Sequence, residues 1–158
     1  AQPDFALALL REAKKRHIHT TIETCGHYPT DVLDQACRVL DALIFDIKCL
    51  DSARHKKATG VGSELILKNI GHVFEHFPDL PVLIRTPVIP GFNDTEEDIL
   101  GIREMIPRKA NIRYEALTYH RMGQPKYGYL GRRYELEGVK ADEAFMKRLN
   151  IMLKSYEK

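Results

Sequence analysis

The chain has 158 residues, of which 44% are hydrophobic and 29% charged, and its net charge is +2. These values are typical of one globular domain, residues 1–158, with a single core. Basic residues are interspersed with acidic ones, as in the segment 132–135, so we expect no nucleic acid partner. No stretch approaches the roughly 18 apolar residues of a membrane span, and we expect no signal peptide. We therefore expect no membrane association.

The three cysteines are Cys25, Cys37 and Cys49. An odd and sparse set of this kind favours a reducing compartment, which predicts a cytoplasmic protein. Their spacing matches no metal-binding motif, and a helix and two strand ends are expected to separate them. We interpret them as structural or incidental thiols.

The predicted elements alternate between helices and strands. The chain opens with an amphipathic helix over 5–16 and no strand before it, which leads us to expect that the strand covered by this helix is missing. The helix that follows the first strand is expected to be capped by Thr30 or Asp31, and the helix at 94–105 by a capping box of Asp94 and Glu97. In chain order, the remaining predictions are strand 19–24, helix 30–40, strand 42–47, helix 63–77, strand 82–89, helix 94–105, strand 111–117 and helix 141–156.

This order, a helix and then four strand-helix units, predicts an α/β fold with a parallel sheet and right-handed crossovers. Periodicity does not distinguish a partial barrel from a doubly wound sheet. Both architectures place their functional sites in the loops at the carboxyl ends of the strands. The search for function therefore begins at those ends.

The expected strand ends are unusually polar. Glu23 closes the first strand, Asp46 and Lys48 the second, Arg85 lies in the third, and His120 follows the fourth. Because Asp46 and Lys48 are two residues apart, they should point to the same side of their strand. Charges in an apolar strand need a partner or a ligand. Two interpretations stay open: an ion pair that closes the sheet, or a polar ligand site shared by several strands.

Arg85 has the same two interpretations. Its guanidinium can clamp a carboxylate of a ligand, or it can pair with Glu23 or Asp46 across the sheet. His120 is a weaker candidate, since one histidine among seven is usually an ordinary surface or core residue.

Several short blocks, in this order and at these spacings, resemble pyruvate formate-lyase activating enzyme and its relatives. This family comprises the radical SAM enzymes that activate glycyl radical enzymes. The resemblance covers nearly the whole chain. The blocks are Glu23-Thr24-Cys25-Gly26, Phe45-Asp46-Ile47-Lys48, residues 84–94, Tyr119-His120 with Gly123, Lys126-Tyr127, and Gly138-Val139-Lys140 before the last helix.

The resemblance implies a partial (β/α)6 TIM-like barrel, of which the chain carries about the last four β/α units. In this family a CxxxCxxC loop holds a [4Fe–4S] cluster, and a Gly-Gly-Glu block binds the amino group of S-adenosylmethionine (SAM). Both motifs would lie upstream of Ala1, and none of the three cysteines matches a cluster ligand. We therefore expect the chain alone to be inactive, to bind no cluster and to bind SAM only weakly.

The resemblance also assigns roles to the polar strand ends. Lys48 would contact SAM, His120 would lie near the adenosine, and Arg85 near SAM and the incoming glycyl loop. Asp46 and Glu23, with backbone from Thr24 and Ile44, match the place of a monovalent cation. In the intact enzyme the reduced cluster would cleave SAM, and the resulting radical would abstract hydrogen from a glycine of a partner such as pyruvate formate-lyase.

Two alternatives remain beside this hypothesis. One is a different radical SAM enzyme, such as a maturase or another lyase activator. The other is a non-enzymatic module with a nucleotide-sized pocket. In addition, strand 19–24 would be an unpaired sheet edge without the preceding strands, so we expect the chain to self-associate through it.

Overall fold

The computed structural model describes residues 2–156, and at its centre is a sheet of four parallel strands in the order β1-β2-β3-β4. The strands follow one another across the sheet in chain order, whereas in a doubly wound sheet the order reverses part-way. Strand order thus favours consecutive units of a barrel-like fold, which periodicity had left open. The strands are β1 (Thr21–Thr24), β2 (Ala42–Asp46), β3 (Val82–Val88) and β4 (Ile112–Thr118).

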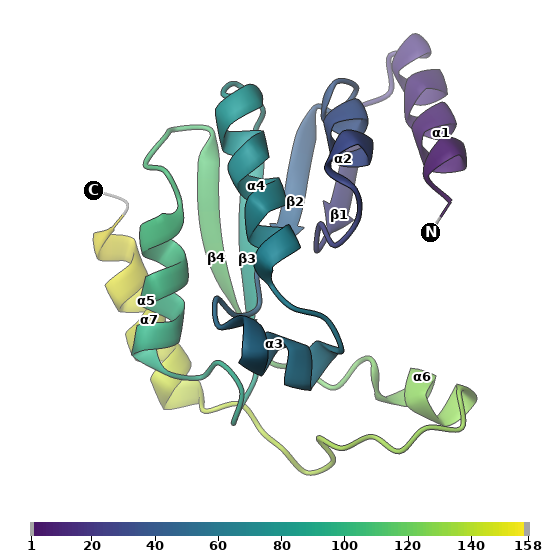
Figure 1. The fold of residues 1–158 in the computed structure, drawn as a ribbon. Helices are drawn as coiled ribbons and strands as arrows, with labels where there is room; N and C mark the ends of the chain where they lie inside the picture. Colours follow the sequence, from purple (N-terminus) through teal and green to yellow (C-terminus); the bar gives the residue numbers. More distant parts are fainter. Residues whose placement is uncertain (1, 157–158) are drawn as a thin grey trace.

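The helices cover one side of this sheet, where α2, α4 and α5 lie across the strands and α7 packs beside α5 (Figure 1). This arrangement follows from right-handed crossovers between neighbouring parallel strands. No helix among residues 2–156 is long and apolar enough to cross a membrane. The helices are α1 (Pro3–Lys15), α2 (Thr30–Cys37), α3 (Ser52–Thr59), α4 (Glu64–His76), α5 (Glu96–Met105), α6 (Gln124–Tyr129) and α7 (Glu143–Ser155).

The four strands and the helices α1, α2, α4, α5 and α7 confirm the predicted element order, but α3 and α6 were not predicted. Helix α3 buries only His55, so it has no apolar stripe for periodicity to detect. Helix α6 has six residues, among them a proline and a glycine, and buries none of them. Both helices lie at the end of the sheet toward which the strands point (Figure 1).

Two predicted helix caps are wrong. The capping residue of α5 is Thr95, whose hydroxyl accepts from the backbone nitrogen of Asp98 at 3.1 Å, so the cap lies one residue after the expected Asp94. Helix α2 begins after Pro29 without a side-chain cap, because the Thr30 hydroxyl donates instead to Asn69 Oδ1 at 2.7 Å. A tertiary contact has replaced the local one.

The apolar core lies between the sheet and its helices. Leu43, Phe45 and Ile84 point to this side and are fully buried. Gly26, in the loop after β1, has a φ of +69° and lies against Phe45: a Cβ there would come within 2.2 Å of the Phe45 ring. Glycine is therefore required where the loop crosses the core.

The other side of the sheet has no covering helix among residues 2–156. On this side Ile44, Asp46, Leu83 and Arg85 are half-buried, and the side chains on the outer strands β1 and β4 include exposed ones. We call this side the open face. Parallel sheets are normally covered on both sides, so the open face is where further structure or a ligand is expected.

The β1 edge is less well packed than the rest of the sheet. Strand β1 pairs only with β2 within the described residues, and Leu7 is the one buried residue of α1, whose Phe5 and Leu9 are exposed. An ion pair between Lys14 Nζ and Asp41 Oδ1, 2.6 Å apart, ties α1 to the sheet. Self-association through this edge stays a prediction.

Candidate functional site at the carboxyl ends of the strands

Three of the predicted site residues meet on the open face because of the strand register. Asp46 is the last residue of β2, and its neighbour on β3 is Arg85. Glu23 of β1 lies opposite Ile44, two residues before Asp46 on the same side of β2. Alternation along each strand therefore gathers side chains from three strands at one place.

These residues form one charged cluster with Lys48. The Arg85 guanidinium pairs with Glu23 and also with Asp46 Oδ1, which lies 3.2 Å from Nη2 and 3.4 Å from Nε. Lys48 Nζ lies 3.4 Å from the other Asp46 oxygen, Oδ2. The expectation that Asp46 and Lys48 share a side is confirmed. Of the two interpretations of Arg85, the structure shows the second: its guanidinium pairs with both acids. We call these four residues the charged cluster.

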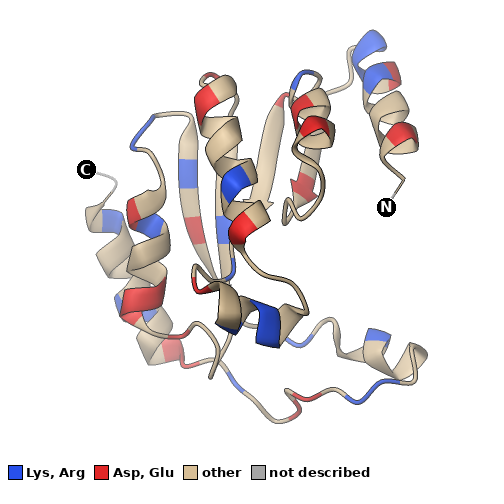
Figure 2. Cartoon of the chain, in the orientation of Figure 1, with Lys and Arg blue, Asp and Glu red and all other residues tan. Residues whose placement is uncertain are grey.

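The charged cluster is partly shielded from water. The side chains of Arg85 and Asp46 are 19% and 17% exposed, while that of Glu23 is 58% exposed. Burial disfavours the charge on Arg85, but its bonds to Glu23 and Asp46 outweigh this effect, so its pKa lies above the ordinary value. The Arg85 guanidinium is therefore charged at neutral pH. Figure 2 shows that charged residues lie on the strands themselves as well as on the helices.

Asn93, which sequence reasoning missed, holds the end of β2 in place. Its side chain is fully buried, and its Nδ2 donates to the Lys48 carbonyl at 2.6 Å and to the Pro87 carbonyl at 2.9 Å. Its Oδ1 accepts from the Ile89 backbone nitrogen at 2.7 Å. One side chain thus joins the backbone beside Lys48 to the loop after β3. The two prolines of the 87–94 segment were its only sequence signal.

Asn69 does the same for the loop after β1. From helix α4, its Nδ2 donates to the carbonyls of Gly26 and Tyr28 at 2.6 and 2.8 Å. The Thr24 hydroxyl accepts from the Gly26 nitrogen at 3.0 Å. The chain just beyond Glu23 is therefore fixed by buried hydrogen bonds, and no local pattern in the sequence indicated this.

His120 is not part of the charged cluster. It is exposed, two residues beyond the end of β4, and its ring makes no hydrogen bond to the rest of the described chain. Its neighbour Tyr119 bonds through its hydroxyl to Tyr134, which closes the long segment between β4 and α7 on itself. Thr24 and Ile44, the proposed backbone ligands, lie in the β1–β2 ladder beside Glu23 and Asp46.

A hollow of about 670 Å³ adjoins Lys48. Its walls come from the end of α3, the loop after β3 and the segment before α7, so it opens at the carboxyl ends of the strands as expected. Its lining residues are Lys48, Ala58, Thr59, residues 89–92, Tyr127 and residues 132–136.

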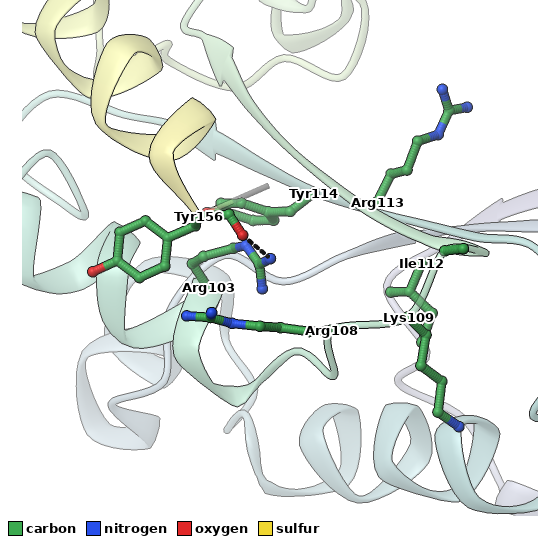
Figure 3. Close-up of a pocket in the computed structure, with 8 residues that line it drawn as sticks. Arg103, Arg108, Lys109, Ile112, Arg113, Tyr114 and Tyr156 are labelled. Carbon is green, nitrogen blue, oxygen red and sulfur yellow. Dashed lines mark hydrogen bonds between the residues drawn. The ribbon is translucent and has the colours of Figure 1, made fainter. Parts of the chain in front are cut away.

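A second hollow, of about 420 Å³, lies at the opposite end of the sheet, where β4 begins. It is lined by basic side chains including Arg103 and Arg108, and the Arg103 Nη2 donates to the Tyr156 carbonyl at 3.3 Å (Figure 3). None of the predicted site residues reaches it. Of these two hollows, the first is the one lined by a residue of the charged cluster, Lys48.

Metal-binding side chains do not cluster in the part of the chain that the structure describes. No group of three or more His, Cys, Asp or Glu side chains that could hold a metal ion is present in residues 2–156. All three cysteines are free: Cys25 is exposed, whereas Cys37 and Cys49 are buried. The charged cluster offers two carboxylates, and any further ligands for a cation there have to come from backbone carbonyls or water.

Residues 1–102 match the radical SAM superfamily. The chain belongs to this superfamily. It is 99% identical over its full length to a (2S)-3-sulfopropanediol sulfolyase activating enzyme of Bilophila wadsworthia, of which it covers 52%. It is 46% identical over 153 residues to an isethionate sulfite-lyase activating enzyme of Nitratidesulfovibrio vulgaris, covering 97% of this chain and 50% of that protein. The chain thus spans about half the length of the curated relatives it matches.

A solved structure supports the same assignment. The fold matches a domain of pyruvate formate-lyase activating enzyme from Bacteroides vulgatus, with a TM-score of 0.76 and 26% identity, over 98% of this chain and 86% of that one. The predicted resemblance to activating enzymes of glycyl radical enzymes is confirmed. So is the α/β fold, as a four-stranded part of the radical SAM fold.

Proposed function

We propose that this chain is the part of a glycyl radical enzyme activating enzyme that carries one side of the SAM site. The observation that supports this most is the charged cluster: four side chains from neighbouring strands meet on the open face, beside a hollow large enough for a nucleotide-sized ligand. A radical SAM domain uses this end of its strands for the cofactor, as α/β folds generally do.

The residues have complementary tasks in this proposal. Lys48 borders the hollow and offers an ammonium group to the carboxylate of SAM. Arg85 lies one strand further and can meet a second anionic or polar group, and His120 is free to turn toward the adenosine. Asn93 and Asn69 keep the strand ends rigid, so that these side chains are positioned before the ligand arrives.

A monovalent cation fits beside SAM at Glu23 and Asp46, with backbone oxygen from Thr24 and Ile44. The support is that one guanidinium already lies between both carboxylates, so their spacing suits a shared positive charge. The iron–sulfur cluster is different, because residues 2–156 contain no group of three or more His, Cys, Asp or Glu side chains that could hold a metal ion. We propose that its cysteines come from residues outside this chain. When bound, the cluster supplies the electron that cleaves SAM.

For the partner, we propose a C–S bond-cleaving glycyl radical enzyme of the sulfopropanediol sulfolyase type. The support is the 99% identity to an activating enzyme with that name, against 26% to the pyruvate formate-lyase activating enzyme domain. The partner expected from sequence, a pyruvate formate-lyase-like enzyme, is the second candidate. A cytoplasmic location suits either partner and stays a prediction.

The decisive experiment uses the full-length protein with a reconstituted cluster. Incubated with SAM and a reductant, it should produce the glycyl radical signal in electron paramagnetic resonance on the sulfolyase and not on pyruvate formate-lyase. The reverse result would overturn the choice of partner. No radical on either, despite measurable SAM binding, would favour the nucleotide-binding module. The present chain alone should give no radical and bind SAM only weakly.

Lys48→Met tests the residue that borders the hollow. Loss of a charged hydrogen bond should weaken SAM binding by at least about tenfold, as measured by isothermal titration calorimetry. Lys68→Met is the matched control, because Lys68 is exposed on α4, on the other side of the sheet. Unchanged SAM affinity in Lys48→Met would contradict the assigned role.

A further inference from the structure

Arg85 lies where the proposed function places a cation. Its guanidinium bonds Glu23 and Asp46 Oδ1, the two carboxylates that would bind the ion. Lys48 uses the other oxygen of Asp46, Oδ2. An ion coordinated by Glu23 and by Asp46 Oδ1 would therefore take the position of the guanidinium and leave the Lys48 contact intact.

The charges of the cluster make simultaneous occupancy unfavourable. Glu23 and Asp46 contribute two negative charges, and Arg85 and Lys48 two positive ones, so the cluster is neutral as it stands. A monovalent cation added to it would leave a net charge of +1 beside Arg85 and Asp46, whose side chains are less than one-fifth exposed. An uncompensated charge in such a place is costly. Either the guanidinium or the ion can hold the two carboxylates.

We propose that Arg85 is a built-in occupant of the cation site, and that binding of a monovalent cation releases its guanidinium toward the ligand side of the open face. The proposal rests on the proposed function, which places the cation at Glu23 and Asp46. It makes Arg85 a positioning residue with two states: paired with the acids in the absence of the ion, and available to an anionic group of SAM or of the partner segment in its presence.

The surroundings of Arg85 permit this movement. The open face has no covering helix within residues 2–156 (Figure 1), and the Glu23 side chain is 58% exposed on a strand whose outer edge is unpaired within the same residues. Only side-chain torsions have to change. In contrast, the backbone on both sides is fixed: the Thr86 hydroxyl donates to the Ile47 carbonyl at 2.7 Å, and Asn93 holds the Lys48 carbonyl.

The test is the sodium affinity of the full-length protein, measured by ²³Na line broadening at constant ionic strength with choline chloride as the balancing salt. In Arg85→Gln the cluster keeps a net charge of −1, so sodium should bind roughly tenfold more tightly than in the wild type. Arg113→Gln is the matched control. It removes the same charge from the same face of the sheet, but on β4 and outside the charged cluster, so the sodium affinity should stay unchanged. Equal or weaker sodium binding by Arg85→Gln would overturn the proposal.

A second measurement needs no variant. In the wild type, sodium but not choline should shift the Nε–H resonance of Arg85 and speed its exchange with water, because the guanidinium leaves its carboxylates. If sodium left the Arg85 Nε–H resonance unchanged, the proposed competition between Arg85 and the ion would be refuted.

The SAM affinity separates this inference from the proposed function. It should rise with sodium in the wild type and lose this dependence in Arg85→Gln. If the wild type bound no SAM at any sodium concentration, the proposed function would fail, while the sodium and resonance measurements would still decide the competition between Arg85 and the ion.

Discussion

The two faces of the sheet use consecutive residues of the same strands in opposite ways. On the helix side, Phe45 and Ile84 are fully buried in the core. One residue further along each strand, Asp46 and Arg85 turn to the open face and pair with each other. The core residues hold the strand ends at fixed spacing, and the charged residues use that spacing to gather around a ligand site. Stability and function are thus separated by the two-residue period of a strand.

The largest expected difference between the faces is in stability. Phe45→Ala should lower the free energy of unfolding by about 3–5 kcal/mol, because it leaves a cavity under the helices. Ile44→Ala is the matched control on the same strand: its side chain is half-buried on the open face, so the loss should be about 1 kcal/mol. Urea denaturation measures both. Equal losses would show that the open face is as tightly packed as the core.

A smaller, pH-dependent effect is expected at the amino-terminal ends of the strands, away from both the core and the charged cluster. Asp41 accepts hydrogen bonds from Lys14 and from the backbone and hydroxyl of Thr20, and these hold its pKa well below its ordinary value of 3.8. A carboxyl group whose pKa is lower in the folded than in the unfolded protein stabilises the fold at pH values above its unfolded pKa. This contribution is lost as the pH falls toward the pKa of the folded state.

Asp41→Asn should therefore lower the melting temperature at pH 7, and the difference from the wild type should shrink as the pH is lowered below about 4. Thermal unfolding followed by circular dichroism at several pH values measures this. Asp79→Asn, at an exposed site that forms no ion pair within the described residues, should have little effect at any pH. A constant difference between Asp41→Asn and the wild type would indicate that the ion pair with Lys14 does not carry the effect.

The smallest expected effect concerns only the chemical reactivity of the cysteine thiols. Cys37 lies on the helix side, where burial, and secondarily the nearby Asp34, raise the pKa of its thiol to about 12. Cys25 is exposed in the loop after β1, near the open face. At pH 8 a thiol reagent such as DTNB should modify Cys25 rapidly and Cys37 only after unfolding, because the thiolate is the reactive form. Equal rates would contradict the packing of α2 on the sheet.

Most of the fold was predictable because its elements have strong local signals. The continuous apolar run of β2 and the helical spacing of α4 and α5 require no tertiary information. The two missed helices lack such signals, since α3 buries only His55 and α6 buries no residue. The wrong cap of α2 has a different cause: Thr30 bonds to Asn69, a residue 39 positions away, and local sequence patterns cannot reveal such a partner. The cap of α5 is local, but it is Thr95, the residue after the expected Asp94.

The candidate site was predictable in composition but not in pairing. Polar residues at successive strand ends identified Glu23, Asp46, Lys48 and Arg85, and the same-strand contact of Asp46 with Lys48 followed from spacing alone. Whether Arg85 binds a ligand or pairs with the acids could not be predicted from spacing, because it depends on which strands are neighbours in the sheet. The two buried asparagines were missed for the same reason, since their partners are backbone carbonyls of other segments.

Residue chemistry and periodicity therefore determined which segments are strands and helices and at which end of the strands the function is expected, and short sequence blocks in a matching order carried the resemblance to a family. These are local properties, encoded within a few neighbouring residues. Strand order and register decided the rest: one covered face and one open face, and a guanidinium placed between two carboxylates from different strands. Only packing of the whole sheet brings those three side chains together, because Glu23 and Arg85 are 62 positions apart in the sequence.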